Sequence, residues 1–269
     1  MSEKPRRLVV AVTGLNAIDS PGPGIAVIRA IRDCADFDVR IIGLSYEALE
    51  PGIYLHNIVD KTYQIPYPSV GTDSLLERIQ YIHDEEKLDV IVPNFDSELY
   101  NFIKISKKLE GMGIKTFLPE IEQFNARDKV KLTDFGKKHD FYVPADKIIH
   151  EQKELKKIED DFEFPIVVKG KFYDAIIAHT MEQAEKAYQK IQAKWGLPII
   201  VQEFIRGTEI NIAALGDGLG NAISIIPMRK LYITDKGKAW AGVTLDDENL
   251  IELARKFIRV TNWRGGCEL

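Results

Sequence analysis

Apolar runs alternate with amphipathic segments over the first 123 residues. Short apolar, β-branched runs predict strands, and these runs fall at 8–14, 38–43, 89–93 and 115–118. Apolar residues at helical spacing predict helices, and these fall at 25–32, 72–86 and 97–110. Strands that alternate with helices are typical of βαβ units, so this section predicts a parallel sheet.

Predicted helices and strands no longer alternate regularly between residues 124 and 202. Helices are predicted over 128–139 and 180–192, and strands over 164–170 and 199–205. Pro144 ends the first of these helical patterns. The combination is typical of a small α+β lobe.

Hairpins dominate the section from 203 to 269. Their strands are predicted at 208–215, 221–227, 231–234 and 238–244, with turns at 216–220 and 235–237. A helix is predicted over 245–260 with Asp246 or Asp247 as its cap, and a last strand begins at Gly265.

Composition places the 269-residue chain among ordinary folded proteins. Hydrophobic residues make up 45% and charged residues 29%, and the net charge of −5 gives no positive field for nucleic acid. No apolar segment reaches the roughly 18 residues of a membrane span. Two cysteines and five scattered histidines form no disulfide framework or metal-ligand pair. A reducing, cytoplasmic location is therefore expected, without nucleic-acid or membrane partners.

A glycine-rich loop follows the first predicted strand. In parallel sheets ligands bind beyond the carboxyl ends of the strands, where the segment 14–24 is predicted to lie. Gly22 and Gly24 suggest a dinucleotide fingerprint, but Val27 stands where its third glycine belongs. A tight turn before a helix is the better interpretation.

A polar loop at 93–98 is predicted at the same edge of the sheet. Asn94, Asp96 and Glu98 either face a substrate there or cap the helix that follows. Asp96 or Ser97 is the preferred cap because short oxygen-bearing side chains reach the first backbone N–H groups.

Two lysines are candidates for binding phosphate. Lys129 lies in the first turn of a predicted helix, and Lys169 ends a predicted strand and precedes Gly170 and Lys171. A lysine beside glycine can direct its ammonium at a phosphate that the backbone approaches closely. Taken singly, each lysine fits a solvated surface position better.

The order of these residues resembles the ATP-grasp superfamily. Three segments resemble its nucleotide-binding half: NARDKVKLTDFGKKHDFYVP, FPIVVKG and IIVQEFIRGTEINIAAL. Two others, VIVPNFDSEL and NWRGGCEL, resemble the branch that contains the carbamoyl-phosphate synthase large subunit and biotin carboxylase. The resemblance covers nearly the whole chain, and its motifs are specific in combination.

The resemblance implies a fold of class α/β and α+β in three parts. A Rossmann-like parallel sheet, the pre-ATP-grasp domain, is expected over 1–123. A two-lobed ATP-grasp domain is expected to follow, with its small lobe over 124–202 and its large lobe over 203–269.

The resemblance also implies roles for individual residues. Lys129 and Lys169 would bind the phosphates of ATP, and Glu209 would accept hydrogen bonds from the ribose. Glu203 and Ile205 would hold the adenine edge through one backbone C=O and one N–H. The whole adenine-binding hinge comprises Gln202, Glu203, Phe204 and Ile205. Without the surrounding pattern, surface carboxylates are the better interpretation of Glu203 and Glu209.

Arg229 is the candidate for steadying the transferred γ-phosphoryl group, a role that its neighbour Lys230 could also fill. A basic hairpin end explains both residues equally well.

The sequence departs from the family pattern in the loop that covers the phosphates. Relatives have a glycine- and serine-rich loop, whereas the segment 170–175 is short and bulky. Fewer backbone amides can wrap a phosphate there, so Lys171 is expected to supply charge instead.

A second departure concerns Mg²⁺. Relatives carry acidic ligands, including a Glu-x-Asn motif, on two further strands, and this chain ends at Leu269 before any such motif. Glu268 lies near the expected region but does not match those positions, so no metal ligand is assigned. The chain is therefore expected to be truncated, incomplete or one half of a split enzyme, and its last strand would offer an open edge.

The function implied is that of an ATP-dependent carboxylate–amine ligase, or its nucleotide-binding portion, working through an acyl phosphate with ATP and Mg²⁺. Its partners would be a small carboxylate and an amine, with a homodimer or a missing C-terminal half as further partners. Two alternatives stay open. One is a carbamoyl-phosphate synthase-type fragment that acts on bicarbonate, and the other is a non-catalytic ATP-binding protein.

Overall fold

A computed structural model of the chain describes residues 7–17, 20–126, 131–171, 174–234 and 239–269. The chain forms two compact units. One unit combines Met1–Glu122 with Ile210–Leu269, and the other is Gln123–Glu209. A parallel sheet and two antiparallel sheets occur together with helices, which confirms the predicted mixture of α/β and α+β structure. No helix in the described ranges has the length and apolar character that a membrane crossing requires.

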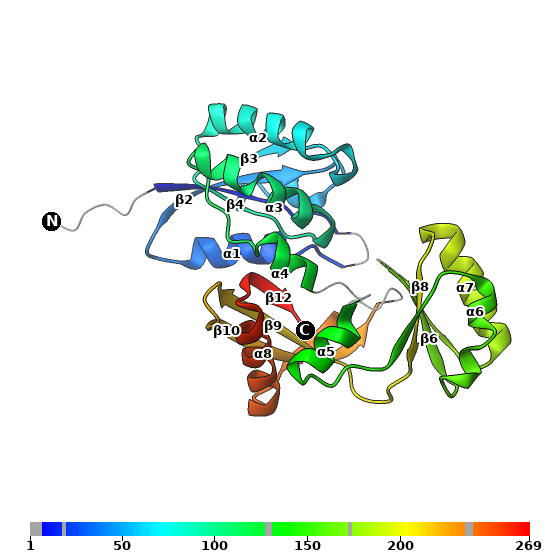
Figure 1. The fold of residues 1–269 in the computed structure, drawn as a ribbon. Helices are drawn as coiled ribbons and strands as arrows, with labels where there is room; N and C mark the ends of the chain where they lie inside the picture. Colours follow the sequence, from blue (N-terminus) through cyan, green and yellow to red (C-terminus); the bar gives the residue numbers. More distant parts are fainter. Residues whose placement is uncertain (1–6, 18–19, 127–130, 172–173, 235–238) are drawn as a thin grey trace. The chain divides into compact units, whose positions relative to one another are not determined.

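A four-stranded parallel sheet forms the N-terminal part of the first unit, in the order β3-β2-β1-β4. The strands are β1 (Arg7–Val12), β2 (Asp38–Ser45), β3 (Lys61–Gln64) and β4 (Val90–Val92). The helices are α1 (Gly24–Asp33), α2 (Thr72–Glu86), α3 (Asp96–Gly111) and α4 (Ile121–Ala126), with 3-10 turns η1 (Pro51–Tyr54) and η2 (Pro68–Val70). Figure 1 shows the helices and strands alternating along this part of the chain.

The predicted helices and most predicted strands of this part are confirmed. The apolar run in β1 is buried at Val10, Ala11 and Val12, where it packs in a core with Ile28 of α1 and Ile41 of β2. The strand β3 was missed because Lys61–Gln64 is a short, polar edge strand that carries no apolar signal.

The predicted strand at 115–118 is wrong. Lys115 forms one isolated parallel bridge with Val90, and no strand follows it. The carbonyl groups of Thr116 and Leu118 accept hydrogen bonds from the Arg264 guanidinium, at 2.9 and 2.8 Å. The Arg264 side chain therefore satisfies backbone carbonyl groups that a neighbouring strand would otherwise pair with.

The C-terminal part of the first unit is an antiparallel sheet in the order β11-β10-β9-β12. Its elements are β9 (Ile210–Asp217), β10 (Ala222–Ile233), β11 (Ala239–Thr244), α8 (Glu248–Thr261) and β12 (Arg264–Glu268). The helix α8 packs on one face, where Ala214, Ile258 and Trp263 form a small core. Asp247 caps α8 as predicted, because its carboxylate accepts from the N–H groups of Asn249 and Leu250.

The strand β10 is continuous where two separate strands were predicted, at 221–227 and 231–234. Its first half pairs with β9 and its second half with β11, so it serves both hairpins. Pro227 does not interrupt β10. Its polar backbone groups face the β11 side of the sheet, where its C=O accepts a hydrogen bond from Leu245 N–H just beyond the end of β11. Proline has no N–H, and the position of that group is on the same side, so no hydrogen bond between β9 and β10 is lost. The turn predicted at 235–237 lies outside the described residues.

A close contact joins β12 to the N-terminal part of the first unit. The Arg264 guanidinium lies 4.8 Å from the centre of the Phe117 ring and donates to the two carbonyl groups that flank that residue. Gly265 has φ +89°, and a Cβ built there would lie 2.4 Å from the Phe117 carbonyl oxygen. Only glycine fits this position without displacing the backbone of residues 116–118.

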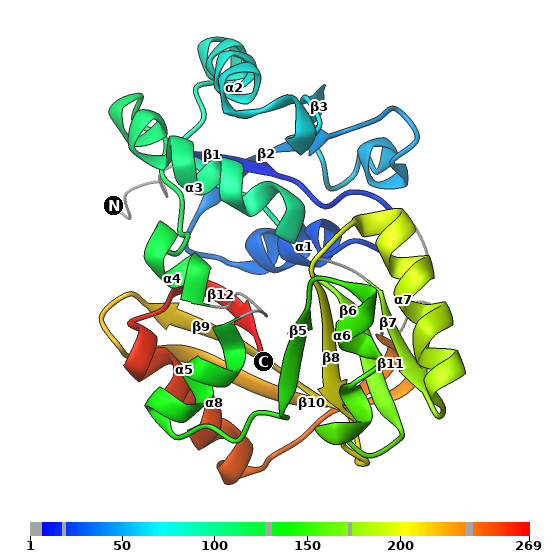
Figure 2. The same ribbon diagram turned by 45° about the vertical axis from the view of Figure 1, so that its right-hand side comes forward.

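The second unit is built on an antiparallel sheet in the order β5-β8-β6-β7. Its elements are α5 (Leu132–His139), β5 (Asp146–Ile149), α6 (Gln152–Leu155), η4 (Ile158–Asp160), β6 (Ile166–Gly170), β7 (Ala175–Ala178), α7 (Met181–Trp195) and β8 (Ile199–Glu203). The helix α7 covers one face of the sheet (Figure 2), where Tyr188 and Ile191 pack on Val168 and Val201. The start of the helix predicted over 128–139 lies outside the described residues.

We expect Gly265→Ala to destabilise the first unit by at least about 2 kcal/mol. The positive φ alone costs an alanine roughly 1–2 kcal/mol, and displacement of the Phe117 carbonyl adds to it. Chemical denaturation measures the effect. Gly266→Ala is the matched control, since a Cβ there meets no atom within 4 Å. Equal losses in the two variants would contradict the close contact.

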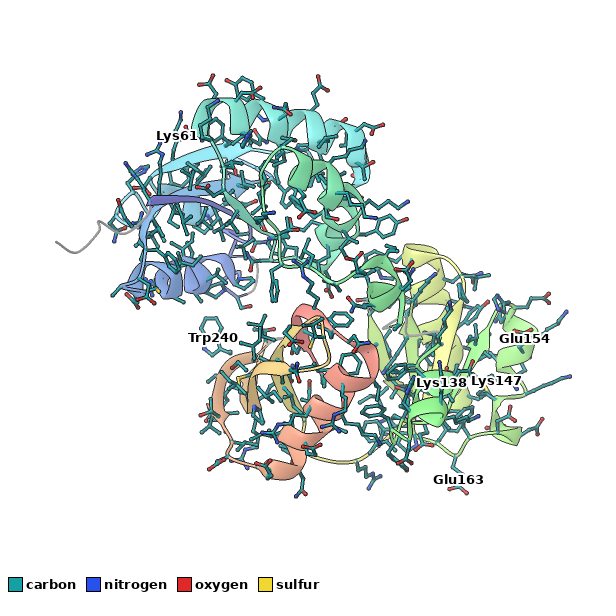
Figure 3. The ribbon with its side chains drawn as sticks, turned by 60° about the vertical axis from the view of Figure 1, so that its left-hand side comes forward. Lys61, Lys138, Lys147, Glu154, Glu163 and Trp240 are labelled. Atoms are coloured by element: carbon teal, nitrogen blue, oxygen red, sulfur yellow. The ribbon has the colours of Figure 1, made fainter. Side chains whose placement is uncertain are left out.

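A buried carboxylate ties α2 to the sheet. Glu86, whose side chain is 6% exposed, accepts from Arg40 at 2.9 Å, from Lys61 at 2.7 Å and from the Tyr63 hydroxyl at 2.7 Å. Lys61 lies at the surface of this unit (Figure 3). Burial alone raises the pKa of Glu86, but the hydrogen bonds from Lys61, Tyr63 and Arg40 outweigh it and lower the pKa from 4.5 to about 2.

The lowered pKa of Glu86 makes its stabilising effect dependent on pH. The contribution is present above pH 4.5 and is lost as the pH falls through about 2, because the folded state resists protonation. Glu86→Gln should cost roughly 1–3 kcal/mol at pH 7 and should lose less stability than wild type between pH 4.5 and 2. Urea denaturation across this range measures both effects. The exposed neighbour Glu85→Gln should change neither quantity, and a variant at Glu86 that behaves like it would refute the prediction.

Candidate nucleotide-binding site

A lysine and a glutamine meet on the face of the second unit's sheet opposite α7. Val168 of β6 and Val201 of β8 point into the core, so Lys169 and Gln202, which follow them, point to the other face. The Lys169 ammonium donates to the Gln202 amide oxygen at 2.5 Å. The sheet therefore holds a partly buried cation in a fixed direction on its second face.

An acidic residue lies on the same face. Asp146 of β5 is in register with Gln202, and it accepts a short hydrogen bond from the Thr133 hydroxyl of α5. Burial raises the pKa of Asp146 and the charge of Asp134 raises it further, while Lys137 and Lys169 oppose the shift. The face thus combines a carboxylate and cations rather than a purely positive phosphate site.

A cavity of about 350 Å³ lies beside Asp146. Its walls come from α5 and the chain that leads into β5, and they include Thr133, Lys137, Phe141 and Val143. The volume is at the lower end of the range for small-ligand pockets. Sequence reasoning missed Asp146 and Thr133, because neither stands in a recognisable motif.

The turn between β6 and β7 is anchored to α7. Gly170 N–H donates to the Asp174 carbonyl at 3.1 Å, and Asp174 adopts φ +65°. The Asp174 carboxylate accepts from Trp195 Nε1 at 2.7 Å and from Lys194 at 2.9 Å, and these bonds lower its pKa. Lys171 lies half-buried at the start of this turn, and residues 172–173 lie outside the described residues.

The predicted adenine-binding segment, 202–205, covers the end of β8 and the two residues after it. Glu203 is the last residue of β8, and its N–H donates to the Ala145 carbonyl at 2.9 Å. The sheet uses this N–H, so the predicted adenine contact of Glu203 would have to use its carbonyl. Phe204 is half-buried, Ile205 is 50% exposed, and Glu209 lies exposed in the irregular segment before β9. Lys129, the other predicted phosphate ligand, lies outside the described residues.

The first unit's antiparallel sheet separates Arg229 from Lys230. Ile225 and Pro227 alternate toward α8, so Arg229, two residues further, lies on that face and is exposed. Lys230 lies on the opposite face, which α8 does not cover. Sequence spacing alone did not distinguish these neighbouring cations.

The same uncovered face carries an amide and a carboxylate. Cys267 of β12 packs toward α8, so Glu268 points to the other face, where it accepts a short hydrogen bond from the Asn211 side chain of β9. Among the described residues, no three His, Cys, Asp or Glu side chains come together as a metal site would require.

A buried carboxylate lies at the carboxyl edge of the parallel sheet. Glu98, 1% exposed, accepts from the Thr13 hydroxyl at 2.5 Å, from Asn94 N–H at 2.7 Å and from Phe95 N–H at 2.9 Å. It also accepts a short hydrogen bond from the Tyr46 hydroxyl. Burial raises the pKa of Glu98, and the four donors oppose the rise.

Glu98 also caps α3, so the predicted caps Asp96 and Ser97 are wrong. Its longer side chain, one turn into the helix, reaches back to the first N–H groups, where a shorter side chain was expected. The alternative role in facing a substrate stays a prediction for Asn94, whose amide donates to the carbonyl groups of Thr13 and Val92 at 3.0 Å.

Comparison with known proteins gives matches in structure only. No protein-family profile matches the sequence, and no curated protein sequence matches it. The chain is similar to the biotin carboxylase domain dimer of a 2-oxoglutarate carboxylase from Hydrogenobacter thermophilus, solved with MgADP, ADP and bicarbonate. That likeness has a TM-score of 0.71 at 19% identity and covers 97% of this chain and 59% of the other.

Two further solved structures are similar. A biotin carboxylase–β-γ-ATP complex from Campylobacter jejuni has a TM-score of 0.70 at 17% identity, with 97% of this chain and 60% of the other covered. An L-amino acid ligase from Bacillus licheniformis has a TM-score of 0.65 at 14% identity, with 97% and 62% covered.

These neighbours are ATP-grasp enzymes, so the predicted resemblance is confirmed at the level of fold. The chain spans about three fifths of the length of the proteins it matches. Identities below 20% do not carry a substrate from one protein to another.

Proposed function

We propose that this chain is an ATP-grasp ligase that joins a carboxylate to an amine, or the nucleotide-binding portion of one. The observation that carries the proposal is the Lys169–Gln202 pair, which holds a cation on the sheet face opposite α7 in a chain that shares the ATP-grasp fold. The MgADP and β-γ-ATP in the names of two structural neighbours support nucleotide as the ligand.

The nucleotide would be held mostly by the second unit. Lys169 and Lys129 would bind its phosphates, with Lys171 adding charge in place of backbone amides. The Glu203 carbonyl and the Ile205 N–H would hold the adenine edge, with Gln202 and Phe204 beside it, and Glu209 would accept from the ribose hydroxyls. The finer architecture proposed is a Rossmann-like N-terminal domain followed by the two ATP-grasp lobes.

The cation that steadies the transferred phosphoryl group would come from β10. Arg229 was the candidate from sequence, and the alternation of β10 adds a reason to prefer Lys230. Lys230 shares its sheet face with Asn211 and Glu268, whereas Arg229 lies on the face that α8 packs against. A cation near the γ-phosphate would stabilise the negative charge that accumulates there in the transition state.

Asn211 and Glu268 fit one side of a Mg²⁺ site. A carboxylate and an amide oxygen are hard ligands of the kind that Mg²⁺ takes together with phosphate oxygens and water. On the face opposite α8, the Asn211 amide nitrogen donates to the Glu268 carboxylate and orients it. When bound, Mg²⁺ would neutralise phosphate charge, and this chain's part would be to orient it through Glu268.

The chemistry implied by the family has two steps. A carboxylate oxygen of the substrate attacks the γ-phosphorus, the bond to the bridging oxygen breaks, and ADP leaves an acyl phosphate behind. An amine nitrogen then attacks the acyl carbon, loses a proton, and displaces phosphate. The protein would contribute position and charge neutralisation, because neither step needs a protein nucleophile.

Bicarbonate is the second candidate for the carboxylate. The two reported structures with the higher TM-scores are biotin carboxylases, and bicarbonate is in the name of one of them. This observation also favours the biotin carboxylase and carbamoyl-phosphate synthase branch over the amino-acid ligases. A dimer belongs to the same proposal, since that neighbour is described as one.

Lys169→Met should weaken ADP binding by at least about tenfold, because the phosphates lose a directed cation. Lys171→Ala should weaken it less. Isothermal titration of the full chain with ADP measures both. Lys157→Met, an exposed lysine of the same unit, is the matched control and should bind ADP like wild type. Absence of ADP binding by wild type would overturn the proposed function, and unchanged binding by Lys169→Met would remove this residue from the site.

Glu268→Gln should abolish the dependence of ADP affinity on Mg²⁺. We expect Mg²⁺ to tighten binding by about tenfold in wild type, because Glu268 would help to hold the ion and the ion would neutralise phosphate charge. The exposed Glu163→Gln should keep the full Mg²⁺ effect. Tightening that survives in Glu268→Gln would exclude this carboxylate as a ligand. Binding that Mg²⁺ leaves unchanged in wild type would favour the non-catalytic ATP-binding alternative.

A further inference from the structure

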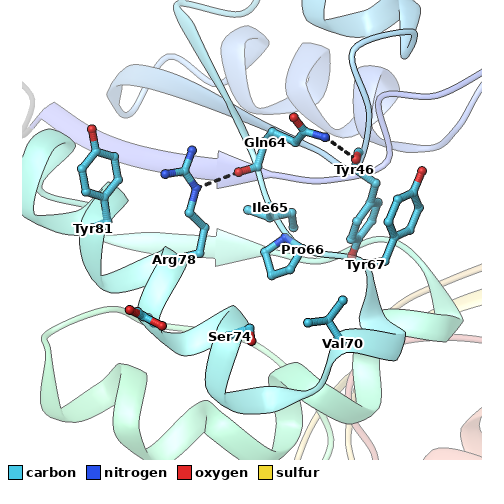
Figure 4. A pocket seen from close by; sticks show the side chains of 10 residues that line it. Tyr46, Gln64, Ile65, Pro66, Tyr67, Val70, Ser74, Arg78 and Tyr81 are labelled. Atoms are coloured by element: carbon cyan, nitrogen blue, oxygen red, sulfur yellow. Dashed lines mark hydrogen bonds between the residues drawn. The ribbon is translucent and has the colours of Figure 1, made fainter.

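A cavity of about 660 Å³ lies in the N-terminal part of the first unit, at the carboxyl ends of β2 and β3. Its walls come from Tyr46 after β2, from residues 64–67 at and after β3, and from α2 (Figure 4). Ligands of parallel sheets bind at such strand ends, and the volume is typical of small-molecule sites. None of the residues proposed for nucleotide or Mg²⁺ lines it.

One end of this cavity is aromatic. The rings of Tyr46 and Tyr67 stack with centroids 5.5 Å apart and planes 19° apart. Tyr46 is buried and its hydroxyl is tied to Glu98, so the stack has a fixed base. Tyr67 is 51% exposed, and Val70 beside it is also exposed. A rigid, flat apolar surface therefore faces the cavity at this end, suited to another ring.

The other end carries an oriented guanidinium. Arg78 Nε donates to the Gln64 carbonyl at 2.8 Å, and the guanidinium lies 4.9 Å from the centre of the Tyr81 ring. Figure 4 shows Arg78 and Tyr81 at the end of the cavity away from Tyr67. No carboxylate in the part of the chain that the structure describes pairs with Arg78, so its two terminal nitrogens can take an oxyanion.

The charge around Arg78 favours a single negative charge. Glu77, the adjacent residue of α2, also lines the cavity, and its carboxylate repels a dianion such as phosphate. Ser74 adds a hydroxyl on the same helix. The cavity thus offers an aromatic surface at one end and a fork of N–H donors, with nearly balanced charge, at the other.

We propose that this cavity binds a small monocarboxylate that carries an aromatic ring. The ring would pack against the stacked pair of Tyr46 and Tyr67, and the carboxylate would accept a two-pronged hydrogen bond from Arg78. The contacts come entirely from the N-terminal part of the first unit. The site therefore stands whether or not the chain binds ATP.

The first test uses 3-phenylpropionate as the probe, titrated into the full chain without nucleotide and followed by ligand-observed NMR. We expect it to bind at least about tenfold more tightly than 3-phenylpropionamide, which lacks the charge, and than propionate, which lacks the ring. Inorganic phosphate should not compete. Equal binding of the amide, or displacement by phosphate, would overturn the proposal, as would no binding of the probe.

Substitutions in the cavity test whether the probe binds there. Arg78→Gln should weaken binding by about tenfold and Arg78→Lys by less, because lysine keeps the charge and loses the fork. Arg29→Gln, an exposed arginine of α1, is the matched control. Because Arg78 also holds the Gln64 carbonyl, Ser74→Phe provides a second variant that fills the cavity and leaves that bond intact.

Binding that survives both Arg78→Gln and Ser74→Phe would place the probe elsewhere and overturn the proposal. Each variant is checked by thermal unfolding, and Ser74→Phe decides the outcome if Arg78→Gln fails to fold. The result is distinguishable from failure of the proposed function, because ADP titration of the same variants should match wild type.

Discussion

The first unit depends on the contact between Arg264–Gly265 and the segment 116–118. The chain leaves this unit after Glu122 and returns at Ile210, so its two sheets come from segments far apart in sequence. Arg264 supplies two hydrogen bonds to backbone carbonyls, and Gly265 allows the two backbones to approach more closely than any side chain would permit. The parallel sheet and the antiparallel sheet of this unit are thereby fixed to each other.

Strand alternation then decides which polar residues can act together. Each antiparallel sheet has one face covered by a long helix, so every second residue points to the other face. In the second unit this rule brings together Lys169, Gln202 and Asp146. In the first unit it brings Lys230 onto the face of Asn211 and Glu268. Among the proposed nucleotide and metal contacts, Lys169 and Gln202 lie on the one face, and Lys230, Asn211 and Glu268 lie on the other.

The shared fold narrows the chemistry and leaves the substrate open. Biotin carboxylases and an L-amino acid ligase have similar structures, although they act on different compounds. Substrate choice must therefore depend on features that vary within the fold. The walls of the cavity lined by Tyr67 and Arg78 include residues of the edge strand β3, the 3-10 turn η2 and the helix α2.

The sequence by itself determined the alternation of strands and helices, the mixed fold class and the resemblance to ATP-grasp enzymes, because these depend on local periodicity and residue order. It placed Lys169 at a strand end and Asp247 at a helix cap, both local features. Only the tertiary structure showed that 116–118 meets a side chain instead of a strand, that β10 continues through Pro227, and that Glu98 is a buried cap. It also separated Arg229 from Lys230 and joined Asn211 to Glu268. These results depend on which distant backbone lies alongside, a property that neither periodicity nor spacing encodes.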